Sequence, residues 1–192
     1  MDAKIYHWGP LLYHNTIIDT DLFEIGKLCH KNKDYDFRGK LAGHLDNEYS
    51  IDEEKFIRII NDYVNNFNAA HEHFYGFQSK LKITKAWVNF MKSGEFNPLH
   101  RHDNCDFSGV LYLSMPDEII KENENWNGNG ANGPGMVSFV ISTPIKNFIN
   151  ERVFLPKRGD IFIFPKDLLH MVSPFKSDVE RISVAFNLAY IK

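Results

Sequence analysis

Cysteine is scarce in this chain of 192 residues, which contains only Cys29 and Cys105. Neither residue lies in a paired motif, so we expect neither a disulfide framework nor a zinc site closed by thiolates. No run approaches the ~20 apolar residues of a membrane span, and residues 1–4 lack the apolar stretch of a signal peptide. The sequence therefore predicts an intracellular, cytoplasmic protein without membrane association.

An excess of charge of either sign is also missing. The chain has 22 basic and 25 acidic side chains, a formal net charge of -3 and a pI near 6.3. Binding to nucleic acid phosphates depends on clustered Lys and Arg, so we expect no nucleic acid partner. A chain of this length fits one domain that buries about 70% of its unfolded surface.

The first 80 residues have mainly helical character, after an extended segment at residues 5–8. A short amphipathic helix is expected over residues 21–30 and a longer one from Ser50 to Gly76. Ser50 and Glu53 form a capping-box pattern, and Gly is common where helices end. Apolar residues recur every three or four positions along the longer helix and must pack against an apolar surface: Phe56, Ile60, Tyr63, Phe67, Ala70 and Phe74.

From residue 81 onward, short runs with strand character alternate with Gly, Pro and Asn. The expected strands are residues 83–90, 108–113, 136–141, 153–155, 161–164 and 181–189. Many short strands late in one chain are typical of a β-sandwich or β-helix. The sequence therefore predicts a mostly β fold with N-terminal helices.

Three histidines form the first candidate for a functional site. Alternate residues of an extended strand point to the same face, so His100 and His102 would present their imidazoles side by side. His170 follows the apolar run at residues 161–165, where a strand or tight turn could bring it back to the first two. Three such ligands leave coordination positions free, as non-haem Fe(II) oxygenases require.

A second candidate lies at residues 181–188. Ile182, Val184, Phe186 and Leu188 would share the face that packs on the core, which leaves Arg181 and Ser183 on the opposite face. A guanidinium there needs an anion, and its planar fork matches a carboxylate. Such a charge-assisted hydrogen bond is worth roughly 1.5–3 kcal/mol, or about 10- to 100-fold in affinity.

These segments together resemble the short 2-oxoglutarate and Fe(II)-dependent oxygenases. The likeness covers about residues 87–188 and is greatest to a prolyl-hydroxylase-like branch found in bacteria and in tailed phages of marine cyanobacteria. For a phage protein, the expected location is the host cytoplasm. The segments that carry the resemblance are NPLHRH at 97–102, SGVLYL at 108–113, GDIFIFP at 159–165, LH at 169–170 and ERIS at 180–183.

The resemblance implies a double-stranded β-helix, a jelly-roll and cupin-like core, as the catalytic part at residues 81–192 of a single domain, with residues 1–80 as its helical support. It also implies Fe(II), 2-oxoglutarate as cosubstrate and O2. Arg181 would bind the far carboxylate of 2-oxoglutarate, with Tyr112 beside it and Ser183 as a further donor. The resemblance brings Asn89 towards the site, although core packing would explain this residue equally well.

One position departs from the family pattern. Most members carry His-x-Asp or His-x-Glu, and here the third position of that motif is His102. Either His100, His102 and His170 form an all-histidine site, or Asp106 supplies the carboxylate. Asp103 is a weaker candidate because strand alternation points it away from His102. The sequence leaves both ligand sets open.

Two other functions remain compatible with the sequence. A cupin-type metal dioxygenase or isomerase would use all four ligand candidates without 2-oxoglutarate, and a non-catalytic jelly-roll module would bind or build without chemistry. The Asn- and Gly-rich segment at residues 116–135 is expected to be a loop, and as a hypothesis it covers the substrate through Trp126. The substrate, a small molecule or a peptide, is not fixed by the fold.

Overall fold

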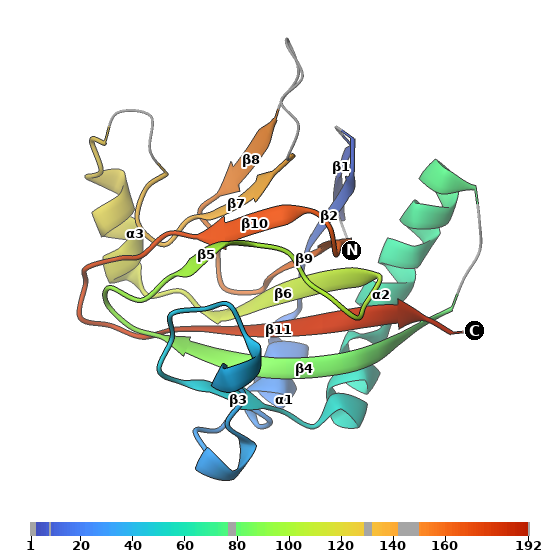
Figure 1. Ribbon diagram of the computed structural model, residues 1–192, viewed down its shortest axis with the longest axis horizontal. Helices are drawn as coiled ribbons and strands as arrows, with labels where there is room; N and C mark the ends of the chain where they lie inside the picture. The colour runs from blue at the N-terminus through green and yellow to red at the C-terminus, as the bar shows by residue number, and fades with distance from the viewer. Residues whose placement is uncertain (1–2, 8, 77–79, 129–131, 142–149, 192) are drawn as a thin grey trace.

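The protein is represented by a computed structural model that describes residues 3–7, 9–76, 80–128, 132–141 and 150–191 (Figure 1). The expected extended segment at 5–8 therefore reaches one residue outside the described part, at Trp8. The expected loop at 116–135 is described except for residues 129–131. Within the described residues, no helix combines the length and the apolar character needed to cross a membrane.

In the described residues, eleven strands form two antiparallel sheets. The larger sheet has the order β1-β2-β9-β6-β11-β4-β3, and the smaller has the order β5-β10-β7-β8. The strands are β1 (Lys4–His7), β2 (Leu11–Thr16), β3 (Glu48–Ser50), β4 (Leu81–Met91), β5 (Asn97–His100), β6 (Phe107–Ser114), β7 (Val137–Val140), β8 (Glu151–Phe154), β9 (Asp160–Pro165), β10 (Leu169–Val172) and β11 (Arg181–Tyr190). This is the mostly β, double-stranded β-helix core that the sequence predicts.

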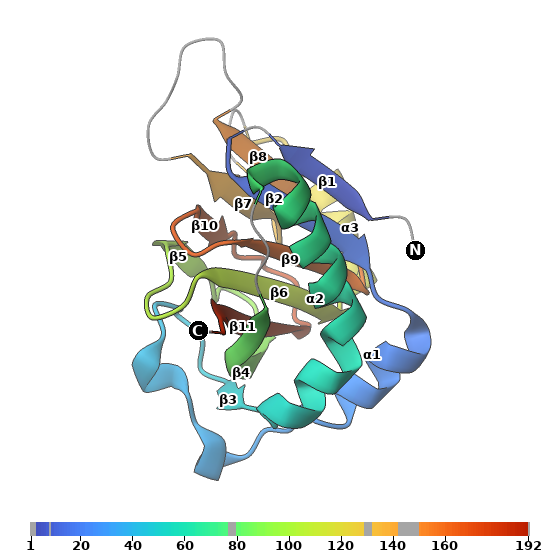
Figure 2. The same cartoon turned by 90° about the vertical axis from the view of Figure 1, so that its right-hand side faces the viewer.

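Helices cover the outer face of the larger sheet. They are α1 (Asp19–Gly26) and α2 (Glu53–Tyr75), while α3 (Asp117–Glu124) lies beside the smaller sheet and two 3-10 turns, η1 (Lys33–Tyr35) and η2 (Arg38–Lys40), precede β3. Figure 2 shows α2 running across the strands on the side opposite to the smaller sheet. The predicted stripe of α2 is buried except for Phe74, which is exposed because it lies in the last turn of the helix.

Strand β11 lies in the interior of the larger sheet, where it pairs with β4 on one side and with β6 on the other. Its even-numbered residues Val184, Phe186 and Leu188 join the core beneath α2, and the ring of Phe186 contacts that of Phe56 at 5.5 Å. Its odd-numbered residues face the space between the two sheets. The alternation predicted for this strand is thus confirmed.

The longer helix begins two residues later than expected. Ser50 belongs to β3, where it pairs with Trp87, so it is not available as a helix cap. Asp52 is the N-cap, and its side chain accepts a hydrogen bond from the backbone N–H of Lys55 at 2.9 Å. The expected end at Gly76 is correct, since this residue adopts the left-handed conformation with φ 75°.

The first 80 residues are more than a helical support. Strands β1 and β2 extend the larger sheet at one edge through the pairing of β2 with β9, and β3 extends it at the other edge through β4. The run Leu11, Leu12 and Tyr13 is fully buried. Such a continuous apolar run is typical of a strand buried on both faces, which periodicity alone does not distinguish from other buried segments.

The packing beneath α2 can be tested by a substitution at Gly109. A Cβ at this position would lie 2.2 Å from the ring of Phe186, so Gly109→Ala should lower the free energy of unfolding by about 1–3 kcal/mol through overpacking. Gly26→Ala is the matched control, because a Cβ there meets nothing within 4 Å and Ala favours a helix. Urea denaturation should give a lower midpoint for the first variant and an equal or higher one for the second. Equal midpoints for Gly109→Ala and the wild type would contradict this packing.

Candidate active site

A cavity of about 550 Å³ lies between the two sheets. The three predicted histidines, Arg181, Ser183 and Tyr112 all contribute to its lining. The larger sheet supplies the residues from β4, β6 and β11, and the smaller sheet supplies His100 and His170 from β5 and β10. The residues that the sequence singled out at distant positions therefore meet in one space.

The pairing of β5 with β10 brings His100 and His170 together. His100 and His170 are direct partners across these antiparallel strands. His102 does not belong to β5, which ends at His100, so the strand alternation expected for this pair stops short of it. Its position is fixed instead by its backbone N–H, which donates to the carbonyl of Lys166 at 3.1 Å.

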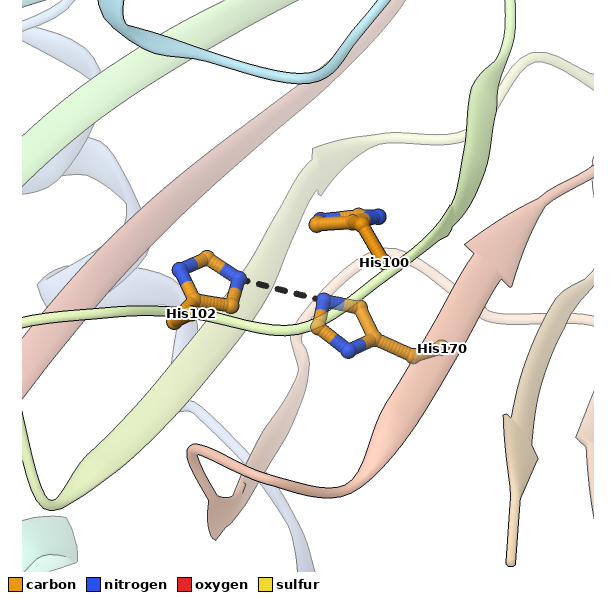
Figure 3. Close-up of side chains that lie close together, drawn as sticks. All are labelled: His100, His102 and His170. Atoms are coloured by element: carbon orange, nitrogen blue, oxygen red, sulfur yellow. Dashed lines mark hydrogen bonds between the residues drawn. The ribbon is translucent and has the colours of Figure 1, made fainter. Parts of the chain in front are cut away.

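The three imidazoles converge (Figure 3). The Nε2 atoms of His102 and His170 are 3.1 Å apart, and the candidate ligand atoms of all three residues lie within 4.8 Å of one another. Nδ1 of His100 lies 2.7 Å from the carbonyl of Pro98, and Nδ1 of His170 lies 3.0 Å from that of Leu168. These carbonyls hold the protons on Nδ1, which leaves the Nε2 lone pairs free for a metal.

Burial keeps the imidazoles neutral. It is the largest cause that lowers the pKa of each histidine, to about 4 for His102 and well below the ordinary value for His170. Neighbouring imidazoles lower the pKa of these two further. Neutral imidazole is the form that binds metal ions. Two nitrogen ligands at about 2.0–2.1 Å from an ion and at right angles lie about 3 Å apart, so this donor set fits a metal.

Arg181 occupies the opposite wall of the cavity and is 1% exposed. Its Nη1 donates to the carbonyl of Gly135 at 3.4 Å, while its Nε has no hydrogen-bond partner among the described residues. No carboxylate of the described residues forms an ion pair with it. Burial lowers the pKa of this guanidinium, but an arginine remains charged in a protein. A buried cation with an unused donor is a site for an anion.

Two further donors surround this guanidinium. The ring of Tyr112 lies 5.4 Å from the Arg181 guanidinium carbon, and its buried hydroxyl has no hydrogen-bond partner among the described residues. Burial raises the pKa of this phenol to about 12, so the hydroxyl keeps its proton. Ser183 is the direct cross-strand partner of Tyr112. Arginine, phenol and serine together offer an anion several hydrogen bonds.

A family model described as "Putative 2OG-Fe(II) oxygenase" matches residues 85–187, which is more than half of the chain. The protein belongs to the 2OG-Fe(II) oxygenases. It is accordingly a 2-oxoglutarate-dependent oxygenase that uses Fe(II) and O2. No curated protein gives a significant match.

Solved structures share the fold of this oxygenase at low identity. A prolyl-4-hydroxylase from Pseudomonas putida is 16% identical, with 94% of this chain and 93% of that chain covered and a TM-score of 0.58. A 2OG-Fe(II) oxygenase family oxidoreductase from Burkholderia pseudomallei is 15% identical, with 89% and 78% covered and a TM-score of 0.57. The viral collagen prolyl hydroxylase from Paramecium Bursaria Chlorella virus-1, in its 2OG complex, is 16% identical, with 92% and 94% covered and a TM-score of 0.55.

The alternative ligand Asp106 does not join the histidines of the oxygenase. Its Oδ2 accepts a hydrogen bond from the backbone N–H of Tyr190 at 2.8 Å, and its own N–H donates to the carbonyl of Leu188. These bonds tie Asp106 to the end of β11. Asp103 is exposed at the mouth of the cavity. Of the two ligand sets left open by the sequence, the geometry favours the three histidines.

The hypothesis that residues 116–135 cover the substrate does not agree with the described part of this segment. Residues 117–124 form α3, which buries Ile119 in the core, and Glu122 accepts hydrogen bonds from the backbone N–H groups of Lys176 and Ser177. Trp126 is 44% exposed and does not line the cavity. Ile119 and the hydrogen bonds of Glu122 therefore hold α3 against the rest of the protein.

Other residues of the oxygenase cavity were not indicated by the sequence. Asn187 hydrogen-bonds to the ring of His102 and accepts a hydrogen bond from the Ser108 hydroxyl at 2.5 Å. Its place on the face of Arg181 was evident from the two-residue period, but that signal gave it no role. Glu48, on β3, also lines the cavity. No local pattern indicates this, because its position depends on pairing with a strand some 40 residues away.

The two candidate ligands differ in their expected response to substitution. His102→Ala should weaken Fe(II) binding at least tenfold, since a ligand is removed, whereas Asp106→Asn should bind Fe(II) like the wild type. Asp106→Asn should instead lower the free energy of unfolding by about 1 kcal/mol, because its hydrogen bond to Tyr190 is no longer charge-assisted. Anaerobic Fe(II) titration and urea denaturation provide the measurements. Loss of iron in Asp106→Asn would refute the all-histidine set.

Proposed function

We propose that this oxygenase hydroxylates a C–H bond of a small-molecule or peptide substrate, with Fe(II) held by His100, His102 and His170. Arg181, Tyr112 and Ser183 would bind the far carboxylate of 2-oxoglutarate. The observation that carries this proposal is the buried guanidinium of Arg181, which has no acidic partner within the described part of the chain and shares a cavity with three converging imidazoles. Binding of 2-oxoglutarate beside the metal would account for both the unpaired guanidinium and the converging imidazoles.

When bound, iron and 2-oxoglutarate supply the oxidation of a C–H bond by O2, with release of succinate and carbon dioxide. The side chains of the protein bind the metal and 2-oxoglutarate and orient them. Arg181 attracts the diacid and fixes one end of it, while Tyr112 donates a hydrogen bond from its neutral phenol. Because the three histidine ligands are neutral, they would not compensate the positive charge of Fe(II) as a carboxylate ligand would. An anionic cosubstrate would supply that compensation.

Aromatic packing holds His170 in place and keeps water from one side of the cavity. The ring of Phe164 contacts the His170 ring at 4.7 Å, and the ring of Phe139 contacts that of Phe164 at 5.0 Å. All three residues are buried. Because the imidazole of His170 is fixed and shielded from water, electrostatic interactions in the site are stronger. The exclusion of water also limits side reactions of a reactive oxidant.

The other functions considered from the sequence fit less well. A cupin-type enzyme with four ligands needs Asp106 beside the histidines, and that carboxylate is engaged at Tyr190. A non-catalytic jelly roll gives no reason to bury Arg181 without a partner, since an uncompensated buried charge destabilises a fold. The arginine therefore supports 2-oxoglutarate as the ligand.

The decisive variant is Arg181→Met, which keeps the side-chain bulk and removes the buried charge. Its affinity for 2-oxoglutarate should fall by about 10- to 100-fold with Fe(II) binding retained, because a charge-assisted pair is lost. The exposed Arg158→Met serves as control and should bind like the wild type. Calorimetry under anaerobic conditions measures both ligands. Wild-type affinity for 2-oxoglutarate in Arg181→Met would contradict the assigned role.

A stability measurement separates this role from a structural one. Ligand binding raises the unfolding temperature by an amount that grows with the logarithm of the affinity, so at a fixed concentration 2-oxoglutarate should raise the Tm of the wild type more than that of Arg181→Met. Without ligand, Arg181→Met should unfold at the same or a higher temperature, since it removes an uncompensated charge. A large drop in Tm without ligand would instead identify Arg181 as a structural residue.

A further inference from the structure

A row of polar residues crosses the cavity face of the larger sheet. Tyr112 on β6 pairs with Ser183 on β11, Ser183 pairs with Asn89 on β4, and Asn89 pairs with Glu48 on β3. These four strands lie side by side in Figure 1. Direct partners in neighbouring strands point to the same face, and all four residues line the cavity. Arg181 lies on β11 two residues before Ser183, so Glu48 is the member of the row whose strand does not pair with β11.

The far end of the row consists of two buried acceptors without donors. Glu48 is 2% exposed and Asn89 is 5% exposed. Glu48 Oε2 and Asn89 Oδ1 have no hydrogen-bond partner among the described residues. Buried polar groups in folded proteins almost always have partners, so two neighbouring exceptions need an explanation. A ligand that brings N–H donors into the cavity provides one.

The charge around Glu48 favours a cation. Burial is the main cause that raises its pKa to about 7, and Glu95 adds to this effect. Arg38 lowers this pKa but is exposed and forms its ion pair with Asp36. No basic side chain of the described residues forms an ion pair with Glu48. A positively charged donor is the partner that would stabilise its carboxylate.

The spacing of the row separates this end from the diacid site. Strands lie about 4.8 Å apart, and β4 lies between β3 and β11, so the Cα atoms of Glu48 and Arg181 are about 10 Å or more from each other. Trp87, two residues before Asn89 on the same face of β4, lies 6.0 Å from the ring of His102. The two acceptors therefore lie on the larger sheet, as Arg181 does, and on the part of it that Trp87 places near the ring of His102.

We propose that Glu48 and Asn89 form a substrate subsite that binds an ammonium or guanidinium group. The carboxylate of Glu48 pairs with the charge, and the amide oxygen of Asn89 accepts a second N–H. The subsite determines specificity and rests on the proposed function, because it gives the substrate of the same iron site a positively charged end. The cavity then has an anion-binding end at Arg181 and a cation-binding end at Glu48.

The test uses pairs of amino acids that differ in this charge. The full-length protein, loaded anaerobically with Fe(II) and 2-oxoglutarate, is titrated by calorimetry with L-arginine and its neutral analogue L-citrulline, and with L-lysine and L-norleucine. At least one cationic probe should bind about tenfold or more tightly than its neutral analogue. Equal binding within both pairs, including no binding by any probe, would overturn the proposal.

Substitution assigns the preference to Glu48. Glu48→Gln should abolish the difference between cationic and neutral probes, whereas Glu54→Gln, the same change on an 88% exposed side chain of α2, should keep it. Retention of the preference in Glu48→Gln would overturn the subsite. Glu48→Gln should also unfold at the wild-type temperature or above, since no hydrogen bond of Oε2 is lost. A lower Tm with an unchanged probe preference would show that Glu48 is a structural residue.

The same titrations separate this inference from the function on which it rests. If the wild type binds 2-oxoglutarate and shows no preference for cationic probes, the subsite is refuted and the oxygenase assignment stands. If the wild type does not bind 2-oxoglutarate with Fe(II), the proposed function fails first.

Discussion

The two-residue alternation of β11 is the constraint on which the rest of the structure depends. This strand is paired on both sides, so its register is fixed and every side chain must belong to one face or the other. Phe186 and its even-numbered neighbours anchor the core beneath α2, and this packing forces Arg181 and Ser183 into the cavity. The packing of the even-numbered residues of β11 beneath α2 thus keeps the charged side chain of Arg181 buried in the cavity, where it does not stabilise the fold.

This constraint explains how far the sequence could predict the site. The face of Arg181 and Ser183 follows from a local period, and their burial confirms it. His170 could be placed near His100 only through the resemblance and a strand return. Residues whose roles depend on distant pairing escaped prediction: Ser50 looked like a helix cap but belongs to β3, and no sequence pattern pointed to Glu48. Local patterns do not encode which strands become neighbours.

The competition between ligands at the metal site illustrates the same limit. Asp106 lies near His102 in sequence, and spacing alone made it a plausible ligand. Its carboxylate instead satisfies the backbone N–H of Tyr190 near the end of β11, a demand that appears only once the strands are paired. His102, although past the end of β5, is held inward by the Lys166 carbonyl and by Asn187. Backbone hydrogen bonding therefore favours His102 over Asp106, although both are chemically reasonable donors.

The all-histidine set also changes the charge balance of the cavity. A carboxylate ligand would neutralise half of the charge of Fe(II) before any cosubstrate binds, whereas three neutral imidazoles neutralise none of it. Together with Arg181, the cavity then attracts anions strongly at one end, and a dianionic cosubstrate is electrostatically favoured there. Glu48 is the buried carboxylate of the same lining. Strand β4 lies between the strands of Glu48 and Arg181, and the two side chains form no ion pair with each other, which keeps both charges available to ligands.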